Sequence, residues 1–408
     1  MSALGSMDQQ PRSLCPVCGG DLTPGGSCER CAQRSVFRLV RREVVLLTFL
    51  SVLAVAVYLG TRALANSNQT LKEKIAVTWF KEGERDLRQG HADDAVAAFR
   101  KAAVNDHRNR VYLLSLAKAL EAAHRDNEGW ELLLQLRESV PENPEINVEL
   151  ARISARQKNV PDALRYYHNA LYGIWTGEDV DKQRQDIRRE LIDFLVSQNA
   201  TDQALAETIA LAAHLPSTPA AHLELGGLFS RVGDFPNALR EFAWVLRRDP
   251  RNQIALRGAG EAAFKMANYA QAKRHLNALA EPDSKAKEML ETARLVLESD
   301  PLAPRLSEQE SIRRARDDID GIKDRMEQCL AQRISGSAIP PFQDAMNKLT
   351  AQMQILTGAQ KHPDPSAISS SIEVIYNAEN LVSTLCGPLT VQDSALLLMA
   401  QKDRGVDQ

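Results

Sequence analysis

A repeated spacing of about 34 residues between small side chains constrains the fold of this chain more than any other feature. The small residues at this spacing form two sets, Ala95, Gly129 and Ala163, then Ala204, Ala238 and Ala272. The step between the sets, from Ala163 to Ala204, is one period plus a seven-residue insertion. A repeated unit of this length buries its apolar face against the next copy, so copies stack into an array. A generic helical bundle, the alternative, would not keep one register on both sides of an insertion. We therefore expect about six repeats over residues 70–300, with the insertion near 173–184.

The composition agrees with a helical, non-enzymatic chain. Aromatic residues make up only 5% of it, while alanine and leucine, which fill helices at little entropic cost, are abundant. A net charge of −3 and a pI near 6.3 give no electrostatic footprint for nucleic acid, so no nucleic-acid partner is expected. The sequence holds no HExxH pair, no phosphate-binding glycine loop and no GxSxG elbow. We therefore expect neither catalysis nor a small-molecule substrate.

The residues of the first repeat, about 76–109, identify the type of unit. Its pattern consists of Trp79, Gly83, Gly90, Ala95, Phe99 and Ala102. Trp79 is suited to filling the space between two helices, Gly83 to a close approach of the second helix, and Gly90 to the turn. The fifth repeat, about 219–252, is nearly as complete, and the second, third, fourth and sixth are more degenerate. This pattern resembles the tetratricopeptide repeat, a helix-turn-helix unit of about 34 residues.

The resemblance implies a fold and a binding surface. Stacked hairpins of this family form a superhelical solenoid in which the first helix of each repeat lines a concave groove. Carried over by position, the candidate groove residues for a protein or peptide partner are Phe80, Arg88, Lys118, Arg152, Arg156, Arg189, Arg231 and Arg257. Their basic character would suit an extended peptide with acidic groups or a free carboxylate. The alternative is that these are solvated charges on helix faces. Trp175, in the insertion, is either a contact residue or a cap on the stack, and we favour the cap.

Four cysteines near the amino terminus have the spacing of a metal site. Cys15, Cys18, Cys28 and Cys31 form two CxxC pairs that are separated by nine residues. Two such turns can close a tetrahedral four-thiolate site, the usual structural zinc arrangement, which leaves no position open for a substrate. Residues 14–35 also resemble the zinc ribbons that open many bacterial membrane proteins, and residues 1–13 are expected to be a disordered tail. Two disulfides, or a redox-active CxxC pair, are the alternatives to a structural Zn²⁺.

Residues 43–65 are long and apolar enough to cross a membrane. The stretch from Val44 to Ala65 contains one charged residue, Arg62, close to its end. Arginines are denser before it than after it, so the positive-inside rule predicts a cytoplasmic amino terminus and a periplasmic repeat array in a single-pass inner-membrane protein. A cleaved signal peptide is one alternative, but about forty residues with a metal site precede the stretch. A buried core helix is the other.

The period stops after Pro301, and residues 301–408 have the pattern of a small helical bundle. Apolar stripes at helical spacing predict helices at 312–329, 345–356 and 372–386, and Thr390 to Asp393 resembles a capping box that opens a fourth. Cys329 and Cys386 lie on two of these stripes. Outside the cytoplasm a disulfide between them is favoured, and two buried free thiols are the alternative.

Together these features predict an all-α, membrane-anchored scaffold for protein–protein interaction. The runner-up is a chaperone-like assembly factor in envelope or secretion biogenesis, which would have a broad, apolar and promiscuous groove. The third possibility, an enzyme with its site in the carboxyl-terminal bundle, lacks paired carboxylates or a His/Cys constellation in the sequence.

Overall fold

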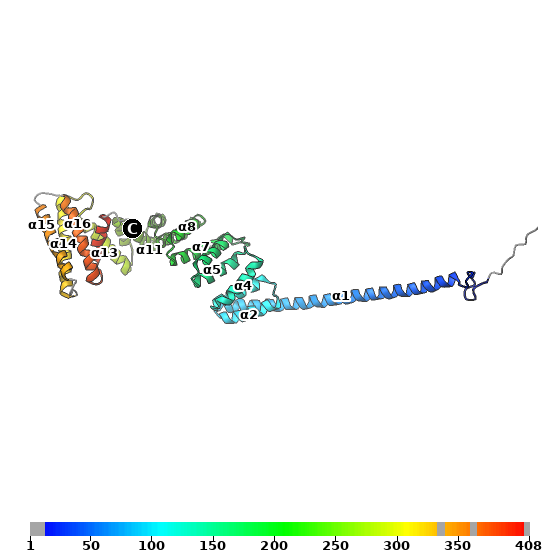
Figure 1. Cartoon of the computed structure of the whole chain (residues 1–408). Helices are drawn as coiled ribbons and strands as arrows, with labels where there is room; N and C mark the ends of the chain where they lie inside the picture. The colour runs from blue at the N-terminus through cyan, green and yellow to red at the C-terminus, as the bar shows by residue number, and fades with distance from the viewer. Residues whose placement is uncertain (1–12, 333–338, 360–364, 404–408) are drawn as a thin grey trace, which may run out of the picture. The chain divides into compact units, whose positions relative to one another are not determined.

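The structure is a computed structural model of the chain, and it describes residues 13–332, 339–359 and 365–403 (Figure 1). The expected disordered tail, 1–13, lies outside the described residues except for Ser13. The secondary structure of the described part is helical, apart from two isolated β-bridges near the amino terminus. The chain divides into two compact units, Met1–Pro141 and Glu142–Gln408.

The first compact unit holds one very long helix and three short ones. Their bounds are α1 Glu29–Arg88, α2 Ala92–Asn105, α3 Arg110–Ala122 and α4 Asp126–Ser139. The expected membrane helix, 43–65, lies inside α1, which continues without a break into the first repeat (Figure 1). The end of α1 packs on α2, and α3 packs on both α2 and α4, so these helices form the first two helical hairpins.

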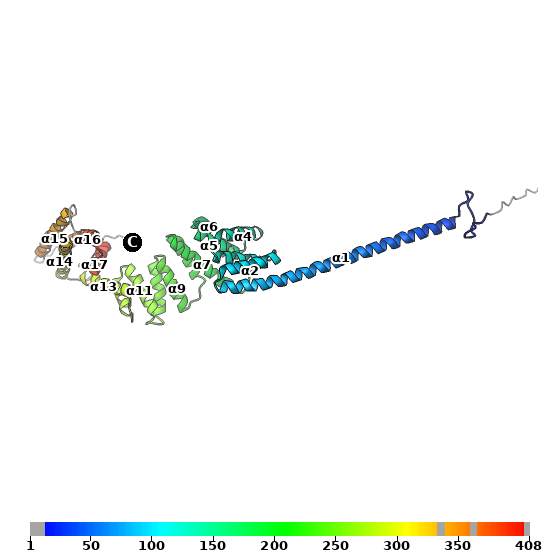
Figure 2. The ribbon, with the colours of Figure 1, turned by 90° about the horizontal axis from the view of Figure 1, so that it is seen from below.

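The second compact unit continues the hairpins and adds the carboxyl-terminal helices (Figure 2). The hairpin helices are α5 Pro144–Arg156, α6 Val160–Tyr172, α7 Val180–Ser197, α8 Thr201–Ala212, α9 Pro219–Arg231, α10 Phe235–Leu246, α11 Gln253–Lys265 and α12 Tyr269–Asn277. After them come α13 Ser284–Ser299, α14 Glu308–Gln332, α15 Ile339–Ala359, α16 Pro365–Leu385 and α17 Val391–Asp403. The helices expected at 312–329, 345–356 and 372–386 correspond to α14, α15 and α16.

The turn inside each of the six hairpins has one residue in the left-handed region. These residues are Gly90 (φ 81°), His124 (φ 56°), Lys158 (φ 58°), Asn199 (φ 56°), Gly233 (φ 83°) and Ala267 (φ 54°). They follow the spacing of the small residues, with one longer step at the insertion. The backbone therefore keeps the same register across all six repeats, although only two of the turns carry glycine.

Glycines allow the close approach of helices that the repeat pattern predicts. A Cβ on Gly83 would lie 2.8 Å from the ring of Phe99, and one on Gly226 would lie 2.6 Å from the ring of Phe242. Both rings are buried and belong to the second helix of the same hairpin. The tasks expected for Gly83 and Gly90 are thus confirmed.

The insertion lengthens both the connection after α6 and the helix that follows it. Residues 173–179 connect α6 to α7, but 180–184 form the first turn of α7, which is 18 residues long where α5 has 13. The indole N–H of Trp175 donates to the carbonyl of Ala170, 2.9 Å away, in the last turn of α6. Trp175 is half-buried there and closes the end of this helix. That it caps the stack of repeats stays a prediction.

The carboxyl-terminal helices share a core with the last repeat. One buried cluster contains Ala263, Tyr269 and Ala272 of the sixth repeat together with residues of α13 to α17. The capping box is confirmed: the backbone N–H of Thr390 donates to Asp393 at 2.7 Å, and that of Asp393 donates to the Thr390 hydroxyl at 3.1 Å. The fold is therefore an all-α array of helical hairpins, closed by a helical bundle.

Candidate functional site

The four amino-terminal cysteines lie together as a metal site requires. All four Sγ atoms are within 4.8 Å of one another, with Cys15 to Cys31 at 3.8 Å and Cys18 to Cys28 at 3.3 Å. A tetrahedral ion with metal–sulfur bonds of about 2.3 Å would hold sulfurs roughly 3.8 Å apart. The residues present therefore fit a four-thiolate metal ion.

The backbone around these cysteines is shaped by two tight turns. In the first, the Gly19 N–H donates to the Cys15 carbonyl at 2.9 Å and the Cys15 N–H to the Gly20 carbonyl at 2.8 Å. Gly19 and Gly26 adopt positive φ values of 67° and 80°, which glycine accommodates without strain. Cys31 lies in the first turn of α1, and Cys28 is the residue directly before this helix.

Backbone hydrogen bonds lower the pKa of one thiol, while the neighbouring sulfurs raise the pKa of another. The backbone N–H groups of Val17 and Cys18 lower the pKa of Cys15 to about 7. The neighbouring sulfurs of Cys18 and Cys15 raise the pKa of Cys31 to about 12. Four thiolates at this spacing repel one another, so a bound divalent cation is the physical means of keeping all of them ionised.

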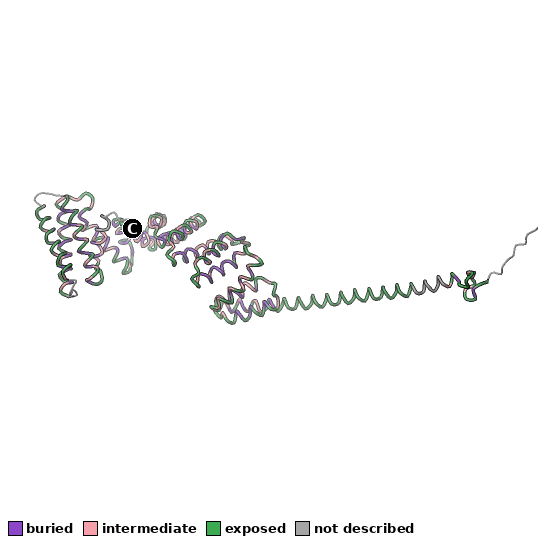
Figure 3. The backbone as a smooth tube through the Cα atoms, viewed as in Figure 1, coloured by how far each residue is buried: buried purple, intermediate pink, exposed green. Residues whose placement is uncertain are grey.

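The apolar part of α1 makes no contacts with the rest of the described chain. Residues 40–75 are all exposed, as Figure 3 shows along the helix, and the first buried residue after them is Ala76. By length and composition, α1 is the one described helix that could cross a membrane, with a mean hydropathy of 2.4 in its most apolar window.

Among the candidate groove residues of the first compact unit, Phe80 is engaged in packing. Its ring lies 4.9 Å from that of Tyr112 and 5.6 Å from that of Phe99, centroid to centroid, and it is half-buried. Arg88 is exposed at the end of α1, and Lys118 is half-buried on α3. Phe80 therefore contributes mainly to the core between hairpins, which its sequence position alone did not reveal.

The arginines of the second compact unit take part in ion pairs between the first helices of successive repeats. Arg152 of α5 donates to Glu190 of α7 at 2.6 Å, and Arg189 of α7 pairs with Glu224 of α9. Arg231 of α9 pairs back to Asp193 of α7 at 2.7 Å.

Two further ion pairs join α11, in the sixth repeat, to the start of α13. Arg257 of α11 pairs with Asp283, the residue before α13, and Lys285 of α13 pairs with Glu261 of α11. Arg156 is exposed on the last turn of α5. The sequence showed the basic residues of this surface but not their partners, so the surface is less basic than the sequence suggested.

One hydrogen-bonded chain has the residue types of a hydrolase site. The Ser217 hydroxyl lies 3.0 Å from Nε2 of His222, whose Nδ1 lies 2.6 Å from Glu241. The imidazole also stacks on Trp244 at 3.7 Å. Residues 216–218 are all exposed. We assign His222 the role of joining α9 to α10.

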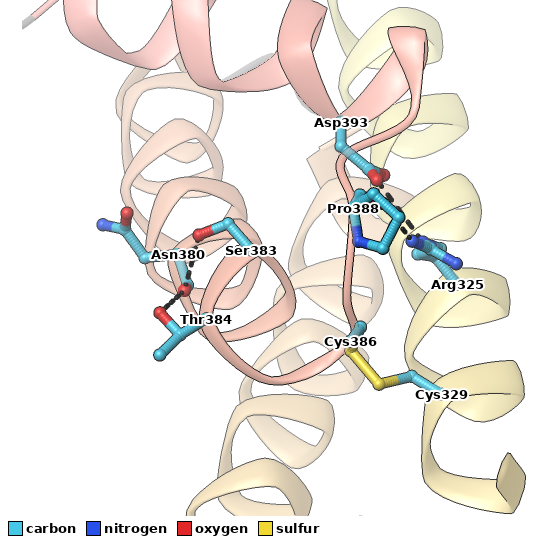
Figure 4. The surroundings of a disulfide bond; sticks show 8 residues. All are labelled: Arg325, Cys329, Asn380, Ser383, Thr384, Cys386, Pro388 and Asp393. Carbon is cyan, nitrogen blue, oxygen red and sulfur yellow. Dashed lines mark hydrogen bonds and ion pairs between the residues drawn. A yellow bond between two sulfur atoms is a disulfide. The ribbon is translucent and has the colours of Figure 1, made fainter. Parts of the chain in front are cut away.

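The two remaining cysteines are bonded to each other. Figure 4 shows the disulfide between Cys329, on α14, and Cys386, directly after α16. Both residues are buried, and the bond closes a loop with a sequence separation of 57.

Comparisons with known proteins indicate which repeat family part of the hairpin array matches. Residues 228–287 match the family model described as tetratricopeptide repeat. This segment runs from the end of α9 into α13 and includes the turns at Gly233 and Ala267. Within residues 228–287, the hairpins match tetratricopeptide repeats. No curated protein matches the chain.

Several solved structures are similar in fold. YrrB, described as a TPR protein with an unusual peptide-binding site, is 18% identical, with 46% of this chain and 95% of that chain covered and a TM-score of 0.37. PilF of Pseudomonas aeruginosa is 14% identical, with coverage of 50% and 90% and a TM-score of 0.38. PilW, described as a type IV pilus biogenesis factor, is 18% identical, with coverage of 50% and 91% and a TM-score of 0.38. Likeness at this level carries no conclusion about what this chain binds.

Proposed function

We propose that this chain is a non-enzymatic scaffold that holds a protein partner close to a membrane, which it crosses once through α1. Its repeats lie on the periplasmic side of the inner membrane, and a structural Zn²⁺ site lies on the cytoplasmic side. Tetratricopeptide repeats are a fold used for binding proteins and peptides, and the partner is assigned to the face formed by the first helices.

The continuity of α1 is the observation that carries this proposal. The apolar residues that would lie in the bilayer and the first helix of repeat one belong to the same helix, Glu29–Arg88. The expected span ends at Ala65 and the first buried residue after it is Ala76, a distance of about 17 Å at 1.5 Å per residue. A scaffold attached in this way presents its first repeat close to the bilayer surface.

Two independent features support the periplasmic side for the array. Arginines gather before the apolar segment, at positions that include Arg30, Arg41 and Arg42, and the positive-inside rule assigns that end to the cytoplasm. The disulfide between Cys329 and Cys386 belongs to the opposite end, and disulfides persist in oxidising compartments.

The geometry of the four cysteines supports zinc over the two alternatives. Zinc readily accepts four thiolates in tetrahedral geometry, and the sulfur separations fit that arrangement. Because all four positions would be filled by cysteine, the ion would have no open position for a substrate. Its role would be to fold residues 14–35, which have almost no apolar core of their own.

The ion pairs between repeats indicate which charges a partner segment should carry. The carboxylates of Glu190, Glu224 and Asp193 already neutralise three of the candidate arginines. An acidic peptide would have to compete with these groups, whereas a partner that pairs with both signs of charge would not. We therefore favour a partner segment of mixed charge, bound across several first helices.

Photo-crosslinking from defined positions in intact membranes tests the partner face. A crosslinking amino acid replaces Arg231, on first helix α9, where the side chain is 48% exposed. The matched control replaces Arg240, on second helix α10, where the side chain is 68% exposed. We expect one defined protein to be captured from position 231 and not from position 240. Equal capture from both would contradict the proposed face, and capture of many unrelated proteins from position 231 would favour the chaperone-like alternative.

A further inference from the structure

Helix α17, the last one in the described part of the chain, covers the end of the repeat array. Helix α13 has the place of the first helix of a seventh repeat, because α11 shifted by one repeat period covers 287–299. No second helix of a seventh repeat follows, since the chain continues into α14. Instead α17 packs on α13 and on α16, and Ala293 and Val296 of α13 share a buried cluster with Leu396 and Met399 of α17.

A buried acid lies among the helices that hold α17 in place. Glu379, on α16, has no exposed surface, and both of its carboxylate oxygens are buried without a hydrogen-bond partner. Most buried carboxylates in proteins are paired or hydrogen-bonded, so an acid without partners calls for an explanation. An ionised carboxylate here would carry a desolvation penalty that no hydrogen bond offsets.

The charged groups around Glu379 do not offset the desolvation penalty of its ionised carboxylate. Asp393, at the start of α17, is 3% exposed and adds a second negative charge. Arg325 of α14 is the neighbouring cation, but it lies 3.4 Å from Asp393 and donates to the carbonyl of Pro388, as Figure 4 shows. From α15, the charged residues Asp344 and Lys348 are exposed and pair with each other at 2.7 Å.

We propose that Glu379 is a pH-sensitive latch, which keeps α17 docked on α13 while its carboxyl group is protonated and releases α17 when it ionises. Ionisation would place two carboxylates, Glu379 and Asp393, beside the single guanidinium of Arg325. Asp393 is fixed at the start of α17 by its capping box, so the repulsion acts directly on that helix. Release of α17 would expose the apolar face of α13 and extend the surface available to a partner at this end of the array. The proposal does not depend on the membrane topology.

The direction of the pH effect follows from the charge state that burial favours. The pKa of Glu379 is raised from 4.5 to about 7, mainly by burial and also by the charge of Asp393, while Arg325 lowers it. A group with a raised pKa stabilises the docked state fully below 4.5, and this contribution is lost as pH rises through about 7. Docking of α17 should therefore weaken between these values, by at most about tenfold per pH unit for one proton.

Hydrogen exchange of the full-length protein in detergent, measured at pH 5 and at pH 8 and expressed as protection factors, tests the latch. We expect protection of α17 to fall at least tenfold between these two values, while protection of α11 in the same molecule stays constant. In Glu379→Gln, which keeps the shape and removes the charge, α17 should stay protected at pH 8. Wild-type protein whose α17 protection does not depend on pH would overturn the proposal, and this measurement requires no variant.

Asp318 provides the matched control for a buried acid elsewhere in the bundle. It is 5% exposed, and its pKa is raised to about 8 by burial and by the charges of Asp317 and Asp300, against the opposing effect of Arg314. No group of α17 contributes to this shift. Asp318→Asn should therefore keep the pH-dependent loss of protection in α17. The latch is also overturned if Glu379→Gln loses protection as the wild type does, or if Asp318→Asn alone abolishes the loss.

Discussion

Ala267 adopts the left-handed backbone conformation, φ 54°, that Gly233 adopts at φ 83° in the matching turn of the preceding repeat. An alanine in this region is strained by about 1–2 kcal/mol because its Cβ crowds the following carbonyl oxygen. The array holds it there because helices α11 and α12, one on each side, fix the turn. The geometry of the repeat therefore overrides the backbone preference of alanine at this position.

This strain predicts a stabilising substitution. Ala267→Gly should raise the free energy of unfolding by about 0.5–1 kcal/mol, since relief of strain exceeds the added flexibility of the unfolded chain. Gly233→Ala, the reverse change at the matching turn, should lower it by about 1 kcal/mol. Urea unfolding followed by circular dichroism measures both. Destabilisation by Ala267→Gly would show that the turns are not equivalent.

Two adjacent glycines of α9 should respond to the same substitution with opposite signs. A Cβ on Gly226 would lie 2.6 Å from the Phe242 ring, whereas one on Gly227 would meet nothing within 4 Å. Gly226→Ala should therefore cost about 1–3 kcal/mol through overpacking. Gly227→Ala should gain about 0.5–1 kcal/mol through helix propensity. Thermal unfolding of the two variants side by side tests the packing of α9 on α10, and equal shifts would contradict it.

The turns also show how far the sequence predicts this fold. Gly90 and Gly233 are recognisable as turn residues, but His124, Lys158 and Ala267 occupy the same conformation with no local signal of it. The repeat register located these turns because it depends on packing between repeats rather than on single-residue preference. Helix positions in the carboxyl-terminal region followed from apolar spacing for the same reason.

The site was less predictable because its decisive contacts join residues that are distant in sequence. The arginines of the repeat face were visible, but Glu190 and Glu224 could be recognised as their partners only once consecutive first helices were placed side by side. Glu379 was missed although it left a signal. It lies between Ile375 and Val382 on the apolar face of α16, where an acid is unexpected.

The cysteine cluster predicts one zinc ion per chain. Elemental analysis of the purified full-length protein should find about one equivalent of zinc, and Cys18→Ser should reduce it strongly because three thiolates bind less tightly. The double variant Cys329→Ser/Cys386→Ser should retain the metal. Zinc content that is equal in wild type and Cys18→Ser would contradict the site.

The disulfide should stabilise the bundle while leaving the first repeats unaffected. Closing a loop with a sequence separation of 57 is worth about 4 kcal/mol in the chain-entropy model. Reduction should therefore lower the hydrogen-exchange protection of α14 and α16 but not that of α2 and α3, which belong to the other compact unit. Loss of protection in α2 and α3 as well would indicate that the two units unfold together.

The most direct measurement of the account as a whole is the side of the membrane on which the array lies. A reporter enzyme that is active only outside the cytoplasm, and a fluorescent protein that matures only inside it, are each fused to the carboxyl terminus of the full chain. We predict an active enzyme and a dark fluorescent protein, with the opposite pattern for fusions made after Arg42. An inactive enzyme and a bright fluorescent protein at the carboxyl terminus would contradict the account, because the repeats would then lie in the cytoplasm.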